Sequence, residues 1–87
     1  MEKQKIRSKI KYRIIAPTHV IKEHEADFIM VPSIEGDVGI ISKHAPLLAN
    51  LRKGVIRIKN GESAEEVEVK HGFLEVLDDL VTILVNE

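Results

Sequence analysis

Apolar and polar residues alternate along most of the chain with the two-residue period of β-strands. Between Lys3 and Arg13 every basic residue takes an odd position, whereas Ile10, Tyr12 and Ile14 take even ones. Because successive side chains of a strand point to opposite faces, this stretch predicts a first strand with one basic and one apolar face. No segment sustains the 3.6-residue period of an amphipathic helix. The pattern therefore indicates a protein built from strands.

Breakers and turn residues divide this pattern into short segments. Pro32 is expected to end a strand, because proline has no backbone N–H to donate. Asn60-Gly61 and Asp78-Asp79 predict hairpin turns, which require positive φ. Turn signals recur at the roughly 8–12-residue spacing of sandwiches, so we expect an all-β fold, a small flattened two-sheet β-sandwich. The predicted strands are 11–16, 20–25, 26–31, 38–42, 47–51, 55–59, 65–70, 73–77 and 80–85.

Length and composition favour a single small domain. The chain has 87 residues, a formal net charge of −1 and no cysteine, which excludes disulfides and thiolate metal ligands. No apolar run approaches the roughly 20 residues that span a bilayer, and the N-terminus does not read as a signal peptide. One Tyr, two Phe and no Trp offer few platforms on which nucleic-acid bases could stack. We expect a cytoplasmic protein with no direct membrane insertion.

Residues that could carry chemistry are few. His19 and His24 differ in parity, so on one strand they are expected to face opposite sides and not to share a metal. Glu35 and Asp37 are paired carboxylates, but general acid–base catalysis would need a cleft that a chain this small has little room for. The sequence around them lacks the Lys-Ser/Thr of a phosphate loop. No catalytic residue, metal or cofactor is predicted.

The segment from Ile34 to Leu51, IEGDVGIISKHAPLLANL, carries more glycine, histidine and proline than a strand connection needs. It resembles the signature of the epsilon subunit of F-type ATP synthases (delta in mitochondria), E-G-x-x-G-x-x-x-x-H-x-P-L-L. Three other stretches match in order: IIAPTHVIKEHEADFIMVPSIEG, LRKGVIRI and VKHGFLEVLDDLVTILVNE. The resemblance covers Lys11 to Glu87. It divides the chain into a basic N-terminal extension with the start of the first strand, 1–10, and an epsilon-type β-sandwich domain, 11–87.

The resemblance implies a mechanical role. In the family this domain sits at the foot of the gamma subunit, rests on the ring of c subunits and turns with both, and it catalyses nothing itself. The implied partners are therefore the gamma subunit and the c-ring, and the implied place is the cytoplasmic face of the inner (plasma) membrane, as a peripheral part of the complex. The family usually continues into a C-terminal helical hairpin to which ATP sensing is attributed. This sequence stops at Glu87, so no ATP binding is expected.

The same resemblance implies which residues meet the partners. Glu35, Gly36 and Asp37 would face the c-ring, whose polar loop carries an arginine in the family, and His44 would support that loop or gamma. A solvated acidic turn is the alternative for these residues. The positions that would meet gamma or shape the loops are Gly39, Ala45, Pro46, Leu47 and Gly72.

Several points stay open at this stage. The glycines and Pro46 could serve turns alone, and Leu47, Leu48 and Leu51 could be core instead of partner surface. The family usually has two glycines where this chain has His71-Gly72. Residues 1–8 extend beyond the usual start of the family, and Met1 to Lys5 are expected to be frayed. The alternative function is a free-standing β-domain that binds nucleic acid or anionic surfaces through its basic first strand, and a small enzyme is a third class.

Overall fold

The computed structural model describes residues 9–86, and every regular element in that range is a strand. The predicted basic extension therefore lies largely outside the described residues, and its boundary with the sandwich domain remains a prediction. The strands are β1 Ile10–Ala16, β2 His19–Ala26, β3 Phe28–Ser33, β4 Gly36–Ile40, β5 Leu47–Leu51, β6 Gly54–Asn60, β7 Ser63–Val69, β8 His71–Leu77 and β9 Leu80–Asn86. The all-β prediction is confirmed, and no helix in this part of the chain is long and apolar enough to cross a membrane.

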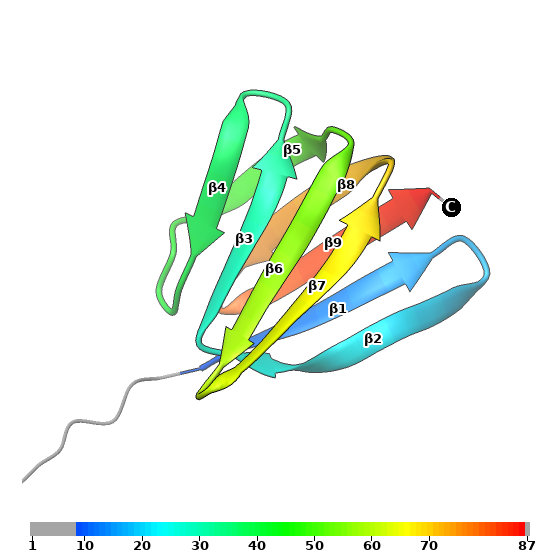
Figure 1. Ribbon diagram of the computed structural model, residues 1–87. Helices are drawn as coiled ribbons and strands as arrows, with labels where there is room; N and C mark the ends of the chain where they lie inside the picture. Colours follow the sequence, from blue (N-terminus) through cyan, green and yellow to red (C-terminus); the bar gives the residue numbers. More distant parts are fainter. Residues whose placement is uncertain (1–8, 87) are drawn as a thin grey trace, which may run out of the picture.

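The strands form one hydrogen-bonded path that curls into two layers. Its order is β2-β1-β9-β8-β5-β3-β6-β7, with β4 paired to β3. In Figure 1, β4, β3, β6 and β7 form one layer, and β5, β8, β9, β1 and β2 form the other. The link between the layers is narrow, because β3 and β5 pair only at Ser33 and Leu51. The predicted two-sheet β-sandwich is confirmed.

The core follows the alternation of the sequence. Ile10, Tyr12 and Ile14 are buried, and Lys11 between them is exposed. Burying one such aliphatic side chain contributes about 1.5–3 kcal/mol, so inward positions from both layers stabilise the sandwich. The other buried apolar residues are Ala16, Ala26, Ile29, Val31, Ile40, Leu51, Ile56, Ile58, Val69, Leu74, Val76, Val81, Ile83 and Val85.

Pro32 and the glycines led to wrong strand boundaries. β3 runs through Pro32, which is buried and pairs with Asp37 of β4. A proline is tolerated there because β6 pairs only with residues 28–30 of β3 and requires no N–H from position 32. β4 starts at Gly36 and not at residue 38. Glycine is compatible with an extended edge strand as well as with a turn. The prediction treated Gly36 as a turn residue and therefore began the strand two residues too late.

The hairpin between β6 and β7 is displaced by one residue from its predicted position. Asn60 pairs with Ser63, which makes Gly61 and Glu62 the two loop residues. Of these, Gly61 has a positive φ of 64°, and glycine at the first loop position is typical of a type II′ turn. The Asp78-Asp79 turn is confirmed: φ is 51° and 61° at these two residues, the type I′ pattern.

A β-bulge corrects the prediction for the two histidines. The register between β1 and β2 shifts at Ile14/Ile15, so one extra residue of β2 is accommodated there. His19 then lies opposite Ala16 and His24 opposite Tyr12, both inward positions of β1. Directly opposed residues share a face, so the prediction that the histidines face opposite sides was wrong. They are still roughly 15 Å apart along the strand.

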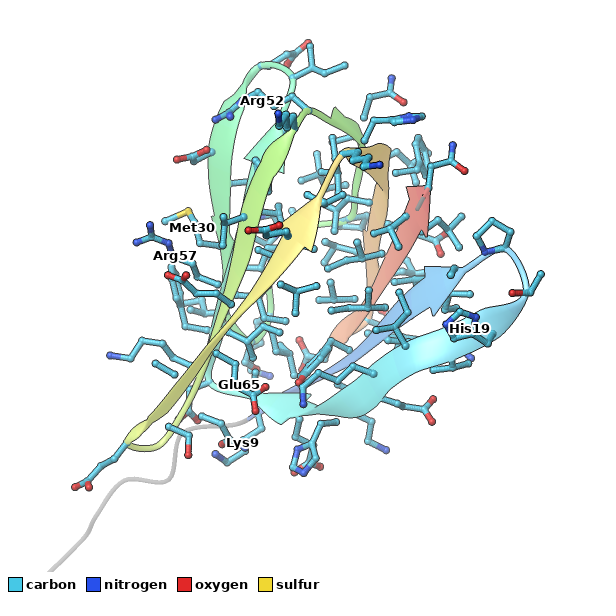
Figure 2. All side chains as sticks on the ribbon, turned by 45° about the vertical axis from the view of Figure 1, so that its right-hand side comes forward. Lys9, His19, Met30, Arg52, Arg57 and Glu65 are labelled. Carbon is cyan, nitrogen blue, oxygen red and sulfur yellow. The ribbon has the colours of Figure 1, made fainter. Side chains whose placement is uncertain are left out.

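The open seam between β2 and β7 is closed by side chains instead of backbone hydrogen bonds. Lys22 Nζ lies 2.9 Å from Glu65 Oε1, and Figure 2 shows Glu65 beside β2. Tyr12 lines the same small cavity as these two residues. Burial raises the pKa of Tyr12 above its ordinary value of 10.0, with Lys22 acting in the opposite direction and Glu65 adding to the rise. The hydrogen bond to Glu65 raises the pKa of Lys22.

These shifts predict a loss of stability at alkaline pH. A group whose pKa is higher in the folded than in the unfolded state holds its proton more firmly when the chain is folded. Its contribution to the free energy of unfolding is therefore complete at pH values below the pKa of the unfolded state and decreases at higher pH. For Tyr12 the fall begins near pH 10.0. Tyr12→Phe should make the free energy of unfolding less dependent on pH in this range. Chemical denaturation at several alkaline pH values measures it. Tyr12 is the single tyrosine, so tyrosinate absorbance should report a midpoint above 10.0 in the folded chain.

Candidate functional site

The hairpin between β3 and β4 forms an acidic corner, which comprises Glu35, Gly36, Asp37 and the Arg52 that is paired with Asp37. Ser33 pairs with Gly36 across a two-residue connection. The Ser33 side-chain Oγ accepts a hydrogen bond of 3.0 Å from the Glu35 backbone N–H. Gly36 has φ of 131°, a conformation that favours glycine. The turn therefore explains Gly36, while the two carboxylates have no part in its geometry.

Arg52 binds this corner and was missed by sequence reasoning. Its Nη2 lies 2.6 Å from Asp37 Oδ1, and its Nε donates to the Ser33 carbonyl at 3.1 Å. The Arg52 backbone N–H also donates to the Pro32 carbonyl at 2.9 Å. Asp37 is thus an ion-paired carboxylate and not a lone charge. Its side chain keeps 58% of its surface exposed, so a partner can still reach it.

His44, Ala45 and Pro46 lie away from the acidic corner. β4 leads from the corner to Ile40, which pairs with Ile29 near the start of β3. In Figure 1 the β3–β4 connection is at the top of the layer and the β4–β5 connection at the bottom. His44 therefore does not support the Glu35 turn directly, and that part of the prediction was wrong, while a contact of His44 with gamma or the ring stays a prediction. Closeness in sequence misled here, because an extended strand separates its two ends by about 3.3 Å per residue.

The β4–β5 loop is held by Asp79 from the β8–β9 turn. Asp79 Oδ1 accepts the Lys43 backbone N–H at 2.6 Å, and Asp79 Oδ2 accepts the Ser42 hydroxyl at 3.2 Å. Lys43 has φ of 68°, which costs a non-glycine residue about 1–2 kcal/mol. Hydrogen bonds to a carboxylate offset that cost. Asp79 thereby positions the loop that carries His44, whose Nδ1 contacts the Ala45 carbonyl oxygen at 2.6 Å.

The two glycines predicted for partner contact or loop shaping have different environments. A Cβ on Gly39 would meet the ring of Phe28 at 3.0 Å, a side chain that can move. A Cβ on Gly72 would overlap the carbonyl oxygen of Leu84 and lie 3.2 Å from the Val85 Cα. Gly72 pairs with Leu51 and Val85, so backbone closeness in the sheet explains it. A direct partner contact at either glycine is untested.

The leucines around β5 divide between core and surface. Leu51 is buried, Leu47 packs partly against the core and Leu48 is 64% exposed. The alternation of the strand separates them, because residues 47, 49 and 51 point inward and 48 points outward. Leu48 is therefore the most exposed of the three, and a partner contact at the half-buried Leu47 stays a prediction.

Exposed apolar residues form an apolar face on part of the outside of the β1, β9, β8 and β5 layer. Leu84 lies between Ile15 and Phe73 in the sheet register, and Leu80 lies opposite Leu77. Leu84 and Leu77 are 46% and 48% exposed. Between these two apolar rows the register places Glu75, Thr82 and Arg13, and Leu48 lies opposite Glu75. The face is therefore two apolar strips divided by a polar row, and exposed apolar surface rimmed by polar residues marks interaction sites in soluble proteins. The apolar face consists of Ile15, Val20, Leu48, Phe73, Leu77, Leu80 and Leu84.

One depression joins the acidic corner to the apolar face. Ile34, Glu35 and Asp37 line one side of it, and Leu48 and Phe73 line the other. Strands β4 and β5 flank it, and Figure 1 shows both at the same border of the sandwich. Within residues 9–86 no group of three or more His, Asp or Glu is placed to hold a metal ion. The site is thus one of apolar and acidic surface.

Fold and surface together define a small β-sandwich domain with an exposed apolar face beside an acidic corner. The profile of the family described as ATP synthase, Delta/Epsilon chain, beta-sandwich domain matches residues 9–87. The chain belongs to this family, and the resemblance seen in the sequence is confirmed.

Curated relatives carry the same family name. The ATP synthase epsilon chain of Alkalihalophilus pseudofirmus is 42% identical over 77 residues, which cover 88% of this chain and 58% of the relative. That of Gloeothece citriformis is 45% identical over 74 residues, covering 85% and 54%. The chain therefore spans a little over half the length of these relatives.

Solved structures share the fold. A chain of the Euglena gracilis mitochondrial ATP synthase, in a structure of OSCP, F1 and the c-ring, matches with a TM-score of 0.84 and 21% identity over 97% of this chain and 54% of that one. A chain of the Tetrahymena thermophila mitochondrial ATP synthase central stalk and c-ring matches with a TM-score of 0.74 and 19% identity, covering 93% and 66%.

Proposed function

We propose that this chain is a non-catalytic central-stalk subunit of an F-type ATP synthase that couples rotation of the c-ring to the gamma subunit during proton-driven ATP synthesis. The apolar face docks on gamma, and the acidic corner contacts the ring. The chain acts at the cytoplasmic face of the membrane as a peripheral part of the complex. Membership of the delta/epsilon family and relatives named ATP synthase epsilon chain support this role.

The observation that carries the proposal is the single depression between Asp37 and Leu48, which has acidic surface on one side and apolar surface on the other. A coupling subunit needs two partner surfaces that are close together on a rigid body. Apolar surface gives a lasting contact by removing area from water. Exposed carboxylates give orientation towards a cationic partner at lower affinity.

The alternative of binding nucleic acid or anionic surfaces rested on the basic first strand. Lys9 Nζ lies 3.0 Å from Asp27 Oδ1, and Arg13 Nε lies 4.0 Å from Glu23 Oε2. Lys11 lies opposite Glu25 in the register. Acidic residues in and just after β2 thus lie beside the basic residues in and just before β1, and a phosphate backbone would have to compete with them. We therefore favour the rotor subunit.

Capture of gamma tests the proposal. Leu84→Asp places a charge at the centre of the apolar face and should weaken binding to the purified gamma subunit by roughly 30-fold or more, the effect of losing an interface hot spot. Ile41→Asp is the matched control, because Ile41 is 53% exposed but lies in the loop after β4. It should leave gamma binding within about threefold, as for a residue outside the interface core. Unchanged binding of folded Leu84→Asp would contradict docking through this face.

A further inference from the structure

The ion pair at the acidic corner leaves one negative charge uncompensated. The corner holds two carboxylates, Glu35 and Asp37, and one guanidinium, Arg52. Lys53 follows in sequence but lines a different depression, with Ile21 and Val69. A surface with this balance accommodates one additional cation without accumulating like charge.

The way in which Arg52 binds Asp37 leaves an acceptor available. The guanidinium donates to Oδ1 alone, at 2.6 Å, while its Nε is used by the Ser33 carbonyl at 3.1 Å. An ionised carboxylate has two oxygens and about four lone-pair sites. Asp37 can therefore accept from a second cation through Oδ2 while Arg52 remains in place. A carboxylate between two cations also stays compensated when the contact excludes water.

Arg52 also connects the three chain segments that meet at the corner. Its backbone N–H binds the Pro32 carbonyl, its Nε binds the Ser33 carbonyl and its Nη2 binds Asp37. These contacts tie the end of β3, the start of β4 and the segment after β5 to one side chain. A lysine would replace it only in part, because a single ammonium keeps the charge but lacks the planar fork that reaches two acceptors in fixed geometry.

We propose that Arg52 is a positioning residue, which holds Asp37 through one oxygen so that the corner is a preformed receptor for one cationic side chain of the c-ring. This inference rests on the proposed function, since it takes the ring as the partner. Arg52 then contributes to recognition of a cationic group although Arg52 itself is a cation. Preformed geometry favours binding because less side-chain freedom is lost when the partner arrives.

The first measurement needs no partner. Amide hydrogen exchange at Glu35, Gly36 and Asp37 in the isolated chain should rise about two- to fivefold in Arg52→Met, the factor expected from loss of an exposed ion pair. Arg57→Met is the matched control. Arg57 lies on β6 with Nε 3.5 Å from Glu66 Oε2, and Figure 2 shows it apart from Arg52 on the same layer. Arg57 lines the same depression as Asp37 and Arg52 but is paired with Glu66 instead. Its loss removes the same charge without removing a contact of the corner and should leave these amides unchanged.

The second measurement uses the complex of this chain with gamma and the purified c-ring in detergent. Arg52→Met should weaken ring binding about two- to fivefold, Arg52→Lys should weaken it less, and Arg57→Met should not change it. Tighter ring binding by Arg52→Met would overturn the inference, since Arg52 would then compete for Asp37. Faster exchange with unaltered ring affinity would overturn it as well.

A neutral corner separates this inference from the function on which it rests. The double variant Glu35→Gln with Asp37→Asn removes both carboxylates and should weaken ring binding most at low salt, where exposed charges interact most strongly. If that double variant binds the ring like the native chain, the ring contact itself is wrong and the inference falls with it. If it weakens binding while Arg52→Met does not, the ring contact stands and only the positioning role is overturned.

Discussion

Gly72→Ala should destabilise the domain by about 3 kcal/mol, the upper part of the range for overpacking a tight interior site. The added methyl group would overlap the backbone carbonyl oxygen of Leu84, and a backbone group within a paired strand cannot turn aside as a side chain can. Either β8 and β9 separate locally or their hydrogen bonds distort. For a domain of this size the melting temperature should fall by about 12–24 °C. Urea denaturation and thermal melting measure both quantities.

Gly39→Ala is the control for this prediction. It makes the same chemical change in an extended strand, but the new methyl group meets the Phe28 ring at 3.0 Å, and that ring can move. Its effect should stay within about 1 kcal/mol, because alanine also reduces the freedom of the unfolded chain. If the two variants unfolded at the same urea concentration, the close approach of the Leu84 backbone would not explain why position 72 requires glycine.

Asp79→Ala should destabilise the domain by about 2.5–5 kcal/mol, from two separate causes. It removes the hydrogen bonds to the Lys43 N–H and the Ser42 hydroxyl, which to an ionised acceptor are worth about 1.5–3 kcal/mol in total for a partly exposed site. It also leaves alanine at φ of 61°, which costs about 1–2 kcal/mol. Amide exchange at residues 42–46 should rise together with the loss of stability seen in urea.

The neighbouring aspartate separates these two causes. Asp78→Ala also places alanine at a positive φ, here 51°. Among the described residues, however, no side-chain hydrogen bond joins Asp78 to the β4–β5 loop. The substitution should cost about 1–2 kcal/mol and leave exchange at residues 42–46 unchanged. Asp79→Gly, which relieves the backbone but loses the hydrogen bonds, should lie between the two alanine variants in stability. Equal exchange in the Asp78 and Asp79 variants would exclude the proposed loop tether.

The fold was predictable because alternation is a local property. Tyr12 and Ile14 reveal their buried face from spacing alone, and Asp78-Asp79 identifies its own turn. The errors arose where pairing overrides local preference. Pro32 locally predicts the end of a strand, and only the pairing shows that β6 does not extend to position 32 and needs no N–H there. The β2 bulge that brings His19 and His24 onto one face depends on register with β1, which no local pattern encodes.

The candidate site was predictable only in part, for the same reason. Glu35 and Asp37 were found because they lie in one short motif. The side chains that organise the two loops, Arg52 and Asp79, come from distant parts of the sequence. Arg52 is separated from Asp37 by 15 positions and Asp79 from Ser42 by 37. The placement of His44 at the other end of β4 likewise follows from strand direction, not from sequence distance.

The parallel pairing of β1 with β9 has a consequence for synthesis on the ribosome. Lys11 to Ile15 lie beside Leu80 to Leu84, and β9 in turn connects β1 to β8. The β1–β2 hairpin is made first, yet the rest of the sheet reaches it only through β9, the last of the described strands to be made. Until β9 leaves the exit tunnel, the nascent hairpin has an unpaired edge and an uncovered apolar face, the condition in which chaperones bind and strands mispair. Closure of the sandwich is then a late, long-range step, which slows folding relative to a protein built from local contacts.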